Sequence, residues 1–240
     1  MIINQTVMGW SKLILFDIDG TLITPGPIPR QALGEAISHF LKRKVELTFH
    51  EVAGLTDPII IRNALVRFGV NPTPTSDEVN VILEYFLDLV EDRLRDSDDV
   101  QVFPGAEALV RACRSQSWIP ALLTGNVERG ARAKLSHTGL WDLFYFGVYG
   151  DDGNTREDLP WIAREQAWEV LNESFSPINT ILIGDTPNDA YVARLNGLNS
   201  MIVCRRKETE WRQAIEAEQP TWIVEGFDNV PSLIQLMREA

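Results

Sequence analysis

The sequence predicts an α/β protein in which a doubly wound, parallel-sheet core is interrupted by an inserted α-helical cap domain. Short apolar runs alternate with helix-length segments over most of the chain, which is typical of a parallel sheet built from βαβ units. The alternation breaks once, between about Thr24 and Asp99, where only helical periodicity remains. Three of the apolar runs end in polar side chains, at the edge where open parallel sheets bind their ligands.

The first apolar run, Leu13–Phe16, predicts a short buried strand that ends in the sequence Asp17-Ile-Asp19-Gly20-Thr21. Two carboxylates two positions apart on an extended chain point to the same side. Buried together they repel each other, so a cation between them is favoured, and Mg²⁺ prefers such oxygen ligands. Gly20 allows a sharp turn after the strand. Taken alone, the pattern also fits a solvated Asp-Gly turn, and the other segments decide between the two interpretations.

The second run, Ile119–Leu123, predicts another buried strand and is followed by Thr124, Gly125 and Asn126. A threonine hydroxyl and free backbone N–H groups at a strand-to-helix junction can form a small anion cradle. By itself this segment could equally be an ordinary capped turn between a strand and a helix.

The third run, Asn179–Ile183, is followed by Gly184-Asp185-Thr186-Pro187-Asn188-Asp189. Pro187 and Asp189 suit the first turn of a helix, where proline and acidic residues are favoured. This turn also has a purely structural interpretation. The three segments together predict a binding site at the carboxyl ends of three neighbouring strands.

The interruption at residues 24–99 is predicted to be a helical cap domain, and residues 1–23 and 100–240 are predicted to form the core domain. A first helix is expected over Pro29–Lys44, and a second begins at Thr56-Asp57-Pro58 and ends at Gly69. A third begins at Ser76, and its apolar side chains recur every three or four residues at Val79, Ile82, Leu83, Phe86, Leu87, Val90 and Leu94.

The chain beyond Gly105 returns to alternating helices and strands. Helices are expected after Gly105 and Val127, at Asp158 and Thr186, and over Glu208–Glu218 and Val230–Arg238. Between them lie the aromatic-rich segment Leu143–Tyr149 and strand-like segments at Ser200–Cys204 and Trp222–Val224.

The three motifs, D-I-D-G-T, T-G-N and G-D-T-P-N-D, resemble in that order the haloacid dehalogenase-like hydrolases, whose core is Rossmann-like. The resemblance extends from about Leu13 to Val203. It is closest to the phosphoglycolate-phosphatase-like branch, because the predicted cap contains Gly54-Leu-Thr56-Asp57. The segment Ala133-Lys-Leu135, with Gly139-Leu140 after it, supports the same branch.

This resemblance implies a phosphatase that uses Mg²⁺ and an aspartyl-phosphate intermediate. Asp17 would be the nucleophile, and Asp19 would be the general acid and base. The metal would be held by the Asp17 carboxylate, the Asp19 carbonyl oxygen and Asp185, with Asp189 orienting this shell from outside. The helical cap would close over the site and recognise the leaving group.

The resemblance also implies a phosphate-binding set made of Thr124, Gly125, Asn126 and one basic residue. The family usually has a lysine between the second and third motifs, and this chain has Arg156 just ahead of an expected helix. Arginine offers a planar fork rather than a point charge. Lys134 is the alternative, but we expect it on the surface of the helix after Asn126, and we favour Arg156.

Two other functions remain open at this point: a phosphomutase of the same superfamily, and a protein that binds a phosphometabolite without turnover. Superfamily dehalogenases and phosphonate hydrolases generally lack a carboxylate at the position of Asp19. Related sugar-phosphate mutases carry a histidine shortly after the first motif, and Leu22–Pro27 contains none. We therefore expect hydrolysis of a small phosphorylated metabolite. The sequence specifies neither the identity of this metabolite nor the oligomeric state of the protein.

Composition excludes several partners. The chain has 240 residues and a formal net charge of −12, from 34 acidic and 22 basic side chains, which disfavours binding to nucleic acid or an anionic membrane. No apolar run reaches the length of a membrane span. Met1–Thr6 lacks the features of a signal peptide, and Cys113 and Cys204 are expected to be free thiols. A cytoplasmic protein is predicted.

Overall fold

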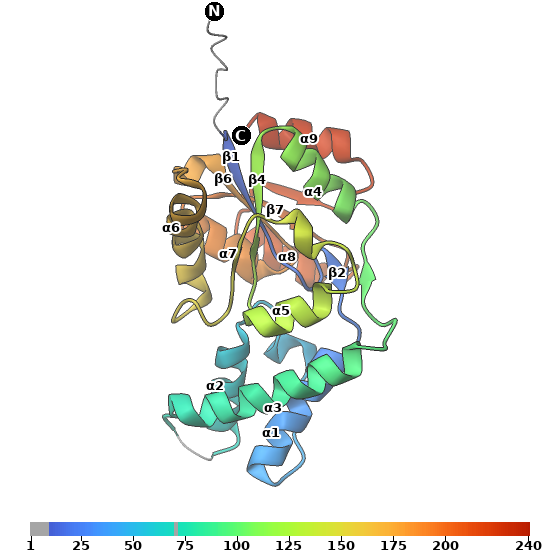
Figure 1. The fold of residues 1–240 in the computed structure, drawn as a ribbon, viewed down its shortest axis with the longest axis vertical. Helices are drawn as coiled ribbons and strands as arrows, with labels where there is room; N and C mark the ends of the chain where they lie inside the picture. The colour runs from blue at the N-terminus through green and yellow to red at the C-terminus, as the bar shows by residue number, and fades with distance from the viewer. Residues whose placement is uncertain (1–9, 70–71) are drawn as a thin grey trace, which may run out of the picture.

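The computed structural model describes residues 10–69 and 72–240, and these contain a parallel sheet of six strands. The sheet occupies the upper half of the molecule in Figure 1. Its spatial order is β5-β4-β1-β6-β7-β8. The strands are β1 (Lys12–Phe16), β4 (Trp118–Leu123), β5 (Gly147–Val148), β6 (Thr180–Gly184), β7 (Asn199–Val203) and β8 (Trp222–Val224). The predicted fold class is confirmed, and each apolar run that predicted a strand overlaps one, although Asn179 and Cys204 lie just outside β6 and β7.

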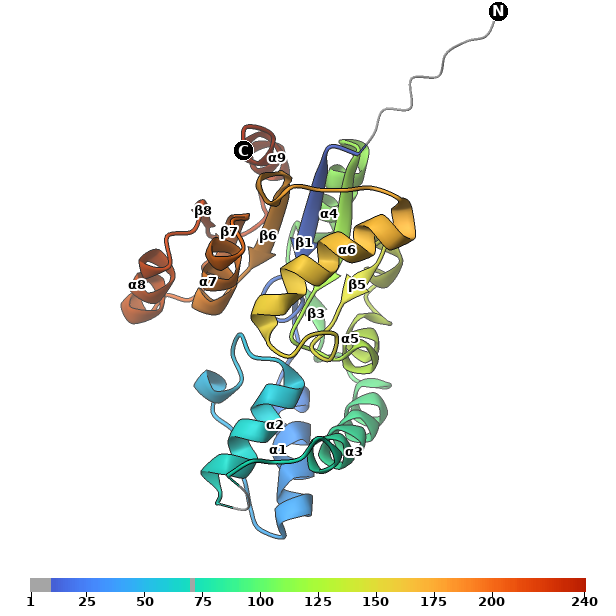
Figure 2. The ribbon, with the colours of Figure 1, turned by 90° about the vertical axis from the view of Figure 1, so that its left-hand side faces the viewer.

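Both faces of the sheet are buried, which explains why its strands are continuous apolar runs. Side chains alternate along β1, so Ile14 and Phe16 pack into the core on one face while Leu13 and Leu15 pack into the core on the other. The first face is covered by α4 (Ala106–Ser115) and α9 (Val230–Arg238). The opposite face is covered by α6 (Leu159–Leu171) and α7 (Pro187–Leu195), and α6 crosses in front of the sheet in Figure 2.

Strand β1 marks the point where the sheet reverses its winding direction. It pairs in parallel with β4 on one side and with β6 on the other. The chain fills one side through β4 and β5 and then crosses β1 to build the other side from β6 to β8. In open α/β sheets this reversal leaves a crevice at the carboxyl ends of the strands. The fold therefore places the ends of β1, β4 and β6 together.

Three helices form a separate layer, seen in the lower half of Figure 1: α1 (Ile28–Leu41), α2 (Asp57–Arg67) and α3 (Ser76–Leu94). Their apolar faces pack into a hydrophobic cluster distinct from those of the sheet. The apolar stripe expected on the third helix is buried in this cluster. Thr75 caps α3 by accepting a hydrogen bond from the Glu78 N–H.

Two short strands where the chain leaves and re-enters the sheet domain were not predicted. β2 (Ile23–Thr24) and β3 (Gln101–Val102) form an antiparallel ribbon, in which Ile23 pairs with Val102. Two-residue strands are too short to show a periodicity in the sequence. The ribbon ties the two crossings between the sheet and the helical layer together. The domain boundaries at residues 24 and 99 stay a prediction.

The remaining elements follow the predicted order. They are α5 (Glu128–Leu135), α8 (Thr209–Ala217) and the 3₁₀ turns η1 (Phe49–Glu51), η2 (Trp141–Leu143), η3 (Arg156–Asp158) and η4 (Pro177–Asn179). Within residues 10–69 and 72–240, we find no helix with the length and apolarity needed to span a membrane. Cys113 and Cys204 are buried free thiols, as predicted. The segment Met1–Thr6 lies outside the described residues.

Candidate active site

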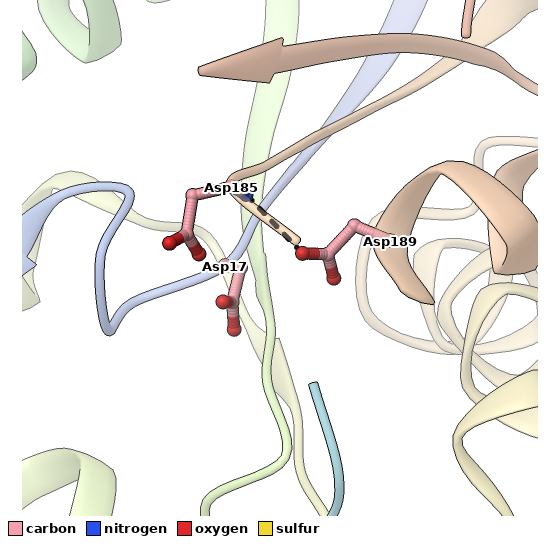
Figure 3. A group of neighbouring side chains, drawn as sticks. All are labelled: Asp17, Asp185 and Asp189. Atoms are coloured by element: carbon pink, nitrogen blue, oxygen red, sulfur yellow. Dashed lines mark hydrogen bonds between the residues drawn. The ribbon is translucent and has the colours of Figure 1, made fainter. Parts of the chain in front are cut away.

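Three aspartates gather at the carboxyl edge of the sheet (Figure 3). Asp17 follows β1, Asp185 follows β6, and Asp189 lies in the first turn of α7. Carboxylate oxygens of the three lie within 4.8 Å of one another. The structure thus brings together residues from the first and third motifs that are far apart in the sequence.

The electrostatics of this cluster favour a bound cation. Burial raises the pKa of Asp17 to about 7, and the nearby carboxylates of Asp189 and Asp19 add to the effect while Arg156 opposes it. Burial and the same carboxylates also raise the pKa of Asp185 well above its usual value. The Oδ1 atom of Asp185 is buried and has no hydrogen-bond partner among the described residues. This oxygen-rich set can hold a divalent cation, which would restore the charged form of both groups.

Asp189 differs from the other two because both of its oxygens already accept hydrogen bonds. Its Oδ1 accepts from Arg156 at 2.5 Å. Its Oδ2 accepts from the Asp185 N–H, the Thr186 N–H and the Thr186 hydroxyl, at 3.2, 2.9 and 2.7 Å. Asp189 is therefore suited to fix the loop that carries Asp185 rather than to bind an ion directly.

The turn after β1 packs Gly20 closely against Asp185. Gly20 has φ +81°, and a Cβ atom on it would lie 2.1 Å from Asp185 Oδ2, so only glycine fits. The guanidinium of Arg205 donates to the carbonyl oxygens of Gly20, at 2.6 Å, and Thr21, at 3.3 Å. No sequence pattern predicts this contact, since Arg205 lies beyond the last motif. Through these two hydrogen bonds Arg205 stabilises the turn that follows Asp19.

The second motif contacts Asp19 through a side-chain amide. Asn126 Nδ2 donates to Asp19 Oδ2 at 2.9 Å and to the Thr124 hydroxyl oxygen at 2.8 Å. Thr124 is fully buried at the end of β4. The N–H of Asn126 also donates to this hydroxyl oxygen at 3.3 Å. All three members of the second motif line the cavity, and Asn126 contacts Asp19 directly.

Lys134 does not lie on the surface of its helix, and that expectation is wrong. Its side chain is buried, and Nζ donates to Asp19 Oδ2 and Asn126 Oδ1, both at 2.5 Å. Helix α5 is enclosed between the sheet and α3, so its inward face reaches the site. A signal existed in the sequence, because Lys134 lies three residues after Ala131 and beside Leu135, which are both buried.

Arg156 also lies in the site, immediately ahead of α6 as expected. Its side chain is only 4% exposed, and NH2 lies 3.3 Å from Asp17 Oδ1 and 2.5 Å from Asp189 Oδ1. The two buried cations thus serve different carboxylates. Arg156 contacts Asp17 and Asp189, whereas Lys134 contacts Asp19.

The helical layer closes the site from the opposite side through the Gly54–Asp57 segment. The Asp57 N–H donates to the Gly125 carbonyl oxygen at 2.8 Å, and the Asp57 carboxylate accepts from the Val127 N–H at 3.1 Å. A Cβ atom on Gly125 would lie 2.1 Å from the Leu55 carbonyl oxygen, so glycine allows this close approach. Burial raises the pKa of Asp57 to about 6, opposed mainly by Lys134.

A cavity of about 550 Å³ lies between the carboxyl edge of the sheet and the helical layer. Its lining includes the site residues, Asp17, Asp19, Thr124, Gly125, Asn126, Lys134, Arg156 and Asp185. The rest of the lining is mostly apolar and basic side chains from both layers. This volume falls within the roughly 300–1,000 Å³ typical of small-molecule sites.

A doubly wound sheet with carboxylates at its reversal point and a helical cap inserted after its first strand defines a class of capped α/β hydrolases. A model of the haloacid dehalogenase-like hydrolase family matches residues 11–197, and the chain belongs to this family. The family predicted from the three motifs is confirmed.

Relatives agree with the predicted branch. The phosphoglycolate phosphatase of Cereibacter sphaeroides is 29% identical over 188 residues, covering 77% of this chain and 81% of that protein. The phosphoglycolate phosphatase of Synechococcus elongatus is 26% identical, covering 95% of this chain and 100% of that protein. Together with the family, they bear out the predicted phosphatase class.

A solved structure shows the same fold. The crystal structure of a predicted phosphoglycolate phosphatase from Haemophilus somnus superposes with a TM-score of 0.69 at 18% identity. The match covers 95% of this chain and 100% of that chain. At this identity the likeness concerns the fold alone, including the cap.

Proposed function

We propose that the protein is a Mg²⁺-dependent phosphatase that hydrolyses a small phosphorylated metabolite through an aspartyl-phosphate on Asp17. The observation that carries this proposal is the pair of Asp17 and Asp185 at the ends of adjacent strands, whose pKa values burial raises. Carboxyl groups with strongly perturbed pKa values in a cleft are typical of functional sites. Asp17 also lines the cavity, where a phosphoester can reach it.

The predicted metal ligands, Asp17, the Asp19 carbonyl oxygen and Asp185, fit Mg²⁺ because they are all oxygen donors. The unpartnered Oδ1 of Asp185 supports this assignment. When bound, the cation would neutralise the repulsion between the nucleophile and the phosphate. Asp189 would hold the loop of Asp185 in place through the N–H groups that it accepts from.

The chain's own groups account for both half-reactions. A carboxylate oxygen of Asp17 bonds to phosphorus as the ester P–O bond breaks, and the leaving alkoxide takes a proton from Asp19. Asp19 then takes a proton from water, whose oxygen bonds to phosphorus. The bond between Asp17 and phosphorus breaks, and inorganic phosphate leaves.

Lys134 and Asn126 are positioning residues for Asp19 in this mechanism. Both donate to Oδ2 of Asp19, at 2.5 and 2.9 Å. The other oxygen, Oδ1, has no partner among the described residues. We assign the proton transfers to Oδ1, because Oδ2 is already occupied by the two donors.

Arg156, the Thr124 hydroxyl and the backbone N–H groups of Gly125 and Asn126 are proposed to bind the phosphoryl oxygens. Arg156 reaches Asp17 Oδ1 at 3.3 Å and lines the cavity, so it can contact a group bonded to Asp17. The Nε atom of Arg156 is buried and has no partner among the described residues, and it remains free for such a ligand.

Phosphoglycolate is the first substrate to test, since the relatives carry its name. A cytoplasmic location is proposed from the two free thiols. We take residues 24–99 as the cap domain and residues 1–23 and 100–240 as the core domain. A phosphomutase remains the second candidate, because it would use the same acids. Phosphorus NMR of hexose phosphates, with and without a hexose bisphosphate, distinguishes release of inorganic phosphate from isomerisation.

The test of the proposal is the Asp17→Asn variant, assayed on p-nitrophenyl phosphate with Mg²⁺. Asparagine keeps the size of the side chain but removes its charge, so turnover should vanish. The matched control is Asp142→Asn, an exposed aspartate in η2, which should keep full activity. Substantial turnover by Asp17→Asn, or full activity of the wild type in a chelator, would contradict the mechanism.

A further inference from the structure

Arg205 connects β7 to the turn that carries the proposed proton donor. It lies two residues beyond this strand, at the carboxyl edge of the sheet. Its NH1 group donates to the Gly20 carbonyl oxygen at 2.6 Å, and its NH2 group donates to the Thr21 carbonyl oxygen at 3.3 Å. The planar guanidinium thus spans two consecutive peptide groups with a fixed geometry, which the point charge of a lysine does not provide. These are the two residues that follow Asp19 in the chain.

Two aromatic rings fix the direction of the Arg205 side chain. The guanidinium carbon lies 3.8 Å from the centroid of the Phe103 ring and 5.2 Å from that of the Phe227 ring. Contact between a guanidinium and an aromatic ring is attractive at these distances. Phe103 directly follows β3, and its N–H donates to the Leu22 carbonyl oxygen at 2.9 Å. Arg205 therefore contacts both crossings of the chain between the sheet and the helical layer.

This setting is unfavourable for a charged group. Arg205 is half-buried, and burial lowers its pKa, while the carboxylates of Asp185 and Asp228 oppose this shift. Its hydrogen-bond acceptors are uncharged carbonyl groups, whereas Arg93 donates to the carboxylate of Glu35 at 2.6 Å. Removing a cation from water without pairing it to an anion costs stability. A contribution to stability alone therefore does not explain why an arginine occupies this position.

The position of Asp19 depends on its backbone as well as on its side chain. Lys134 and Asn126 donate to the Oδ2 atom and hold the end of the side chain. The next residue, Gly20, has φ +81°, and glycine has more backbone freedom than any other residue. The two hydrogen bonds from Arg205 restrict this freedom, because they fix the peptide groups on the carboxyl side of Asp19.

We propose that Arg205 is a positioning residue, which holds the turn after β1 so that Asp19 stays in place for the two proton transfers. This inference rests on the proposed phosphatase function. Arg205 acts through the turn and takes no part in bond formation. A displacement of about 1 Å can lower the rate of a catalysed step by roughly 10²-fold. Loss of the two hydrogen bonds should therefore slow the step that needs the proton from Asp19.

The test is Arg205→Met, which keeps an apolar stem beside the rings but has no donor. Single-turnover phosphorylation of the enzyme is measured with Mg²⁺ on phenyl phosphate and on p-nitrophenyl phosphate. Phenolate is the more basic leaving group and depends more on a proton from Asp19. We expect a loss of about tenfold or more on phenyl phosphate and of less than about threefold on p-nitrophenyl phosphate. The control is Arg111→Met, an exposed arginine of α4 paired with Glu107, which should change neither rate.

Three further measurements distinguish positioning from other roles. Arg205→Lys keeps the charge but lacks the planar fork, so it should recover only part of the rate on phenyl phosphate. Arg205→Met should add little to the loss caused by Asp19→Asn, because both changes affect the same proton transfer. Hydrogen exchange followed by mass spectrometry should be faster in the segment 17–24 of Arg205→Met than in the wild type. If Arg205→Met does not fold, Arg205→Lys takes its place in the comparison of the two aryl phosphates.

The outcomes separate the positioning role from the proposed function. If neither aryl phosphate phosphorylates the wild type, the phosphatase function fails, and the positioning role fails with it. If both do, but the variant loses the same factor on both, Arg205 serves the structure alone and the positioning role is wrong. Weaker binding with an unchanged maximal rate would make Arg205 a substrate contact instead. Wild-type rates in Arg205→Lys would also overturn the proposal, because the charge and not the paired contact with the turn would then be what matters.

Discussion

Two groups of acidic side chains surround an arginine in this molecule, and they differ in their exposure to solvent. In the site, Asp17 and Asp189 flank Arg156, whose side chain is 4% exposed. Between α3 and α5, the second group consists of Glu84, Asp88 and Glu91 around Arg129, which is 37% exposed. Both groups join segments that are distant in the sequence.

The consequences of that difference are opposite. Burial raises the pKa of Asp17 to about 7, although a cation is beside it. Around Arg129, hydrogen bonding from the guanidinium lowers the pKa of Glu91, because solvent removes most of the burial penalty. Exposed ion pairs contribute little to stability. Buried carboxylates carry a desolvation cost in their charged form, and a bound cation can offset this cost. The comparison teaches that burial, rather than the number of charges, marks the site.

After the loss of the Asp17 nucleophile, the largest effect is expected at Asp19, which we propose as the proton donor. Asp19→Asn should lower the rate on alkyl phosphates by roughly 10²–10⁴-fold, because their leaving groups need a proton. Aryl phosphates have better leaving groups, so single-turnover phosphorylation should suffer much less with them. Equal losses on both substrate types would show that Asp19 only shapes the metal site.

The next largest effect on catalysis is expected for Lys134, because its hydrogen bond fixes the position of the Asp19 carboxylate. Lys134→Met should lower kcat by about tenfold to hundredfold while KM changes less, since a misplaced acid costs rate rather than binding. The control is Arg132→Met on the same helix, whose side chain is exposed and pairs with Glu128. A lower melting temperature with normal kcat would mean that Lys134 serves stability alone.

The effect of Mg²⁺ on thermal stability should depend on pH. The ordinary pKa of Asp17, 3.8, is raised to about 7, so the folded, metal-free protein binds this proton more tightly than the unfolded chain. The stability that this group contributes falls as the pH rises between these values. Mg²⁺ needs the ionised carboxylate and competes with the proton.

The Mg²⁺-induced rise in melting temperature should therefore be larger at about pH 8 than at about pH 5.5. A fluorescence melt with and without a chelator measures it. Asp185→Asn should lose most of the rise at both pH values. A rise that is independent of pH would place the ion away from Asp17.

The smallest effect is expected in the exposed group. Arg129→Ala should lower the free energy of unfolding by only about 1 kcal/mol or less, because exposed ion pairs are weak. Chemical denaturation measures this change, and added salt should reduce the difference between variant and wild type. A loss as large as that expected for a buried pair, roughly 3–5 kcal/mol, would contradict the distinction between the two regions.

Local sequence patterns were sufficient for the elements that carry the site. The Leu13–Phe16 run and the alternation around it predicted β1, and Pro187 with Asp189 predicted the start of α7. The reversal point then follows from the order of strands in a doubly wound sheet. For this reason the sequence predicts that Asp17 and Asp185 lie at the same edge of the sheet.

Which groups reach the site from other parts of the chain depends on tertiary packing. Lys134 lies on the buried face of α5, but periodicity reports that a face is buried and not what it is buried against. The β2–β3 ribbon is too short for a pattern, and Arg205 reaches the turn after β1 from far along the chain. Such contacts depend on how layers pack. Local sequence is enough to predict the acids and the strands that carry them, whereas the packing of cap, α5 and sheet selects the cations that these acids meet.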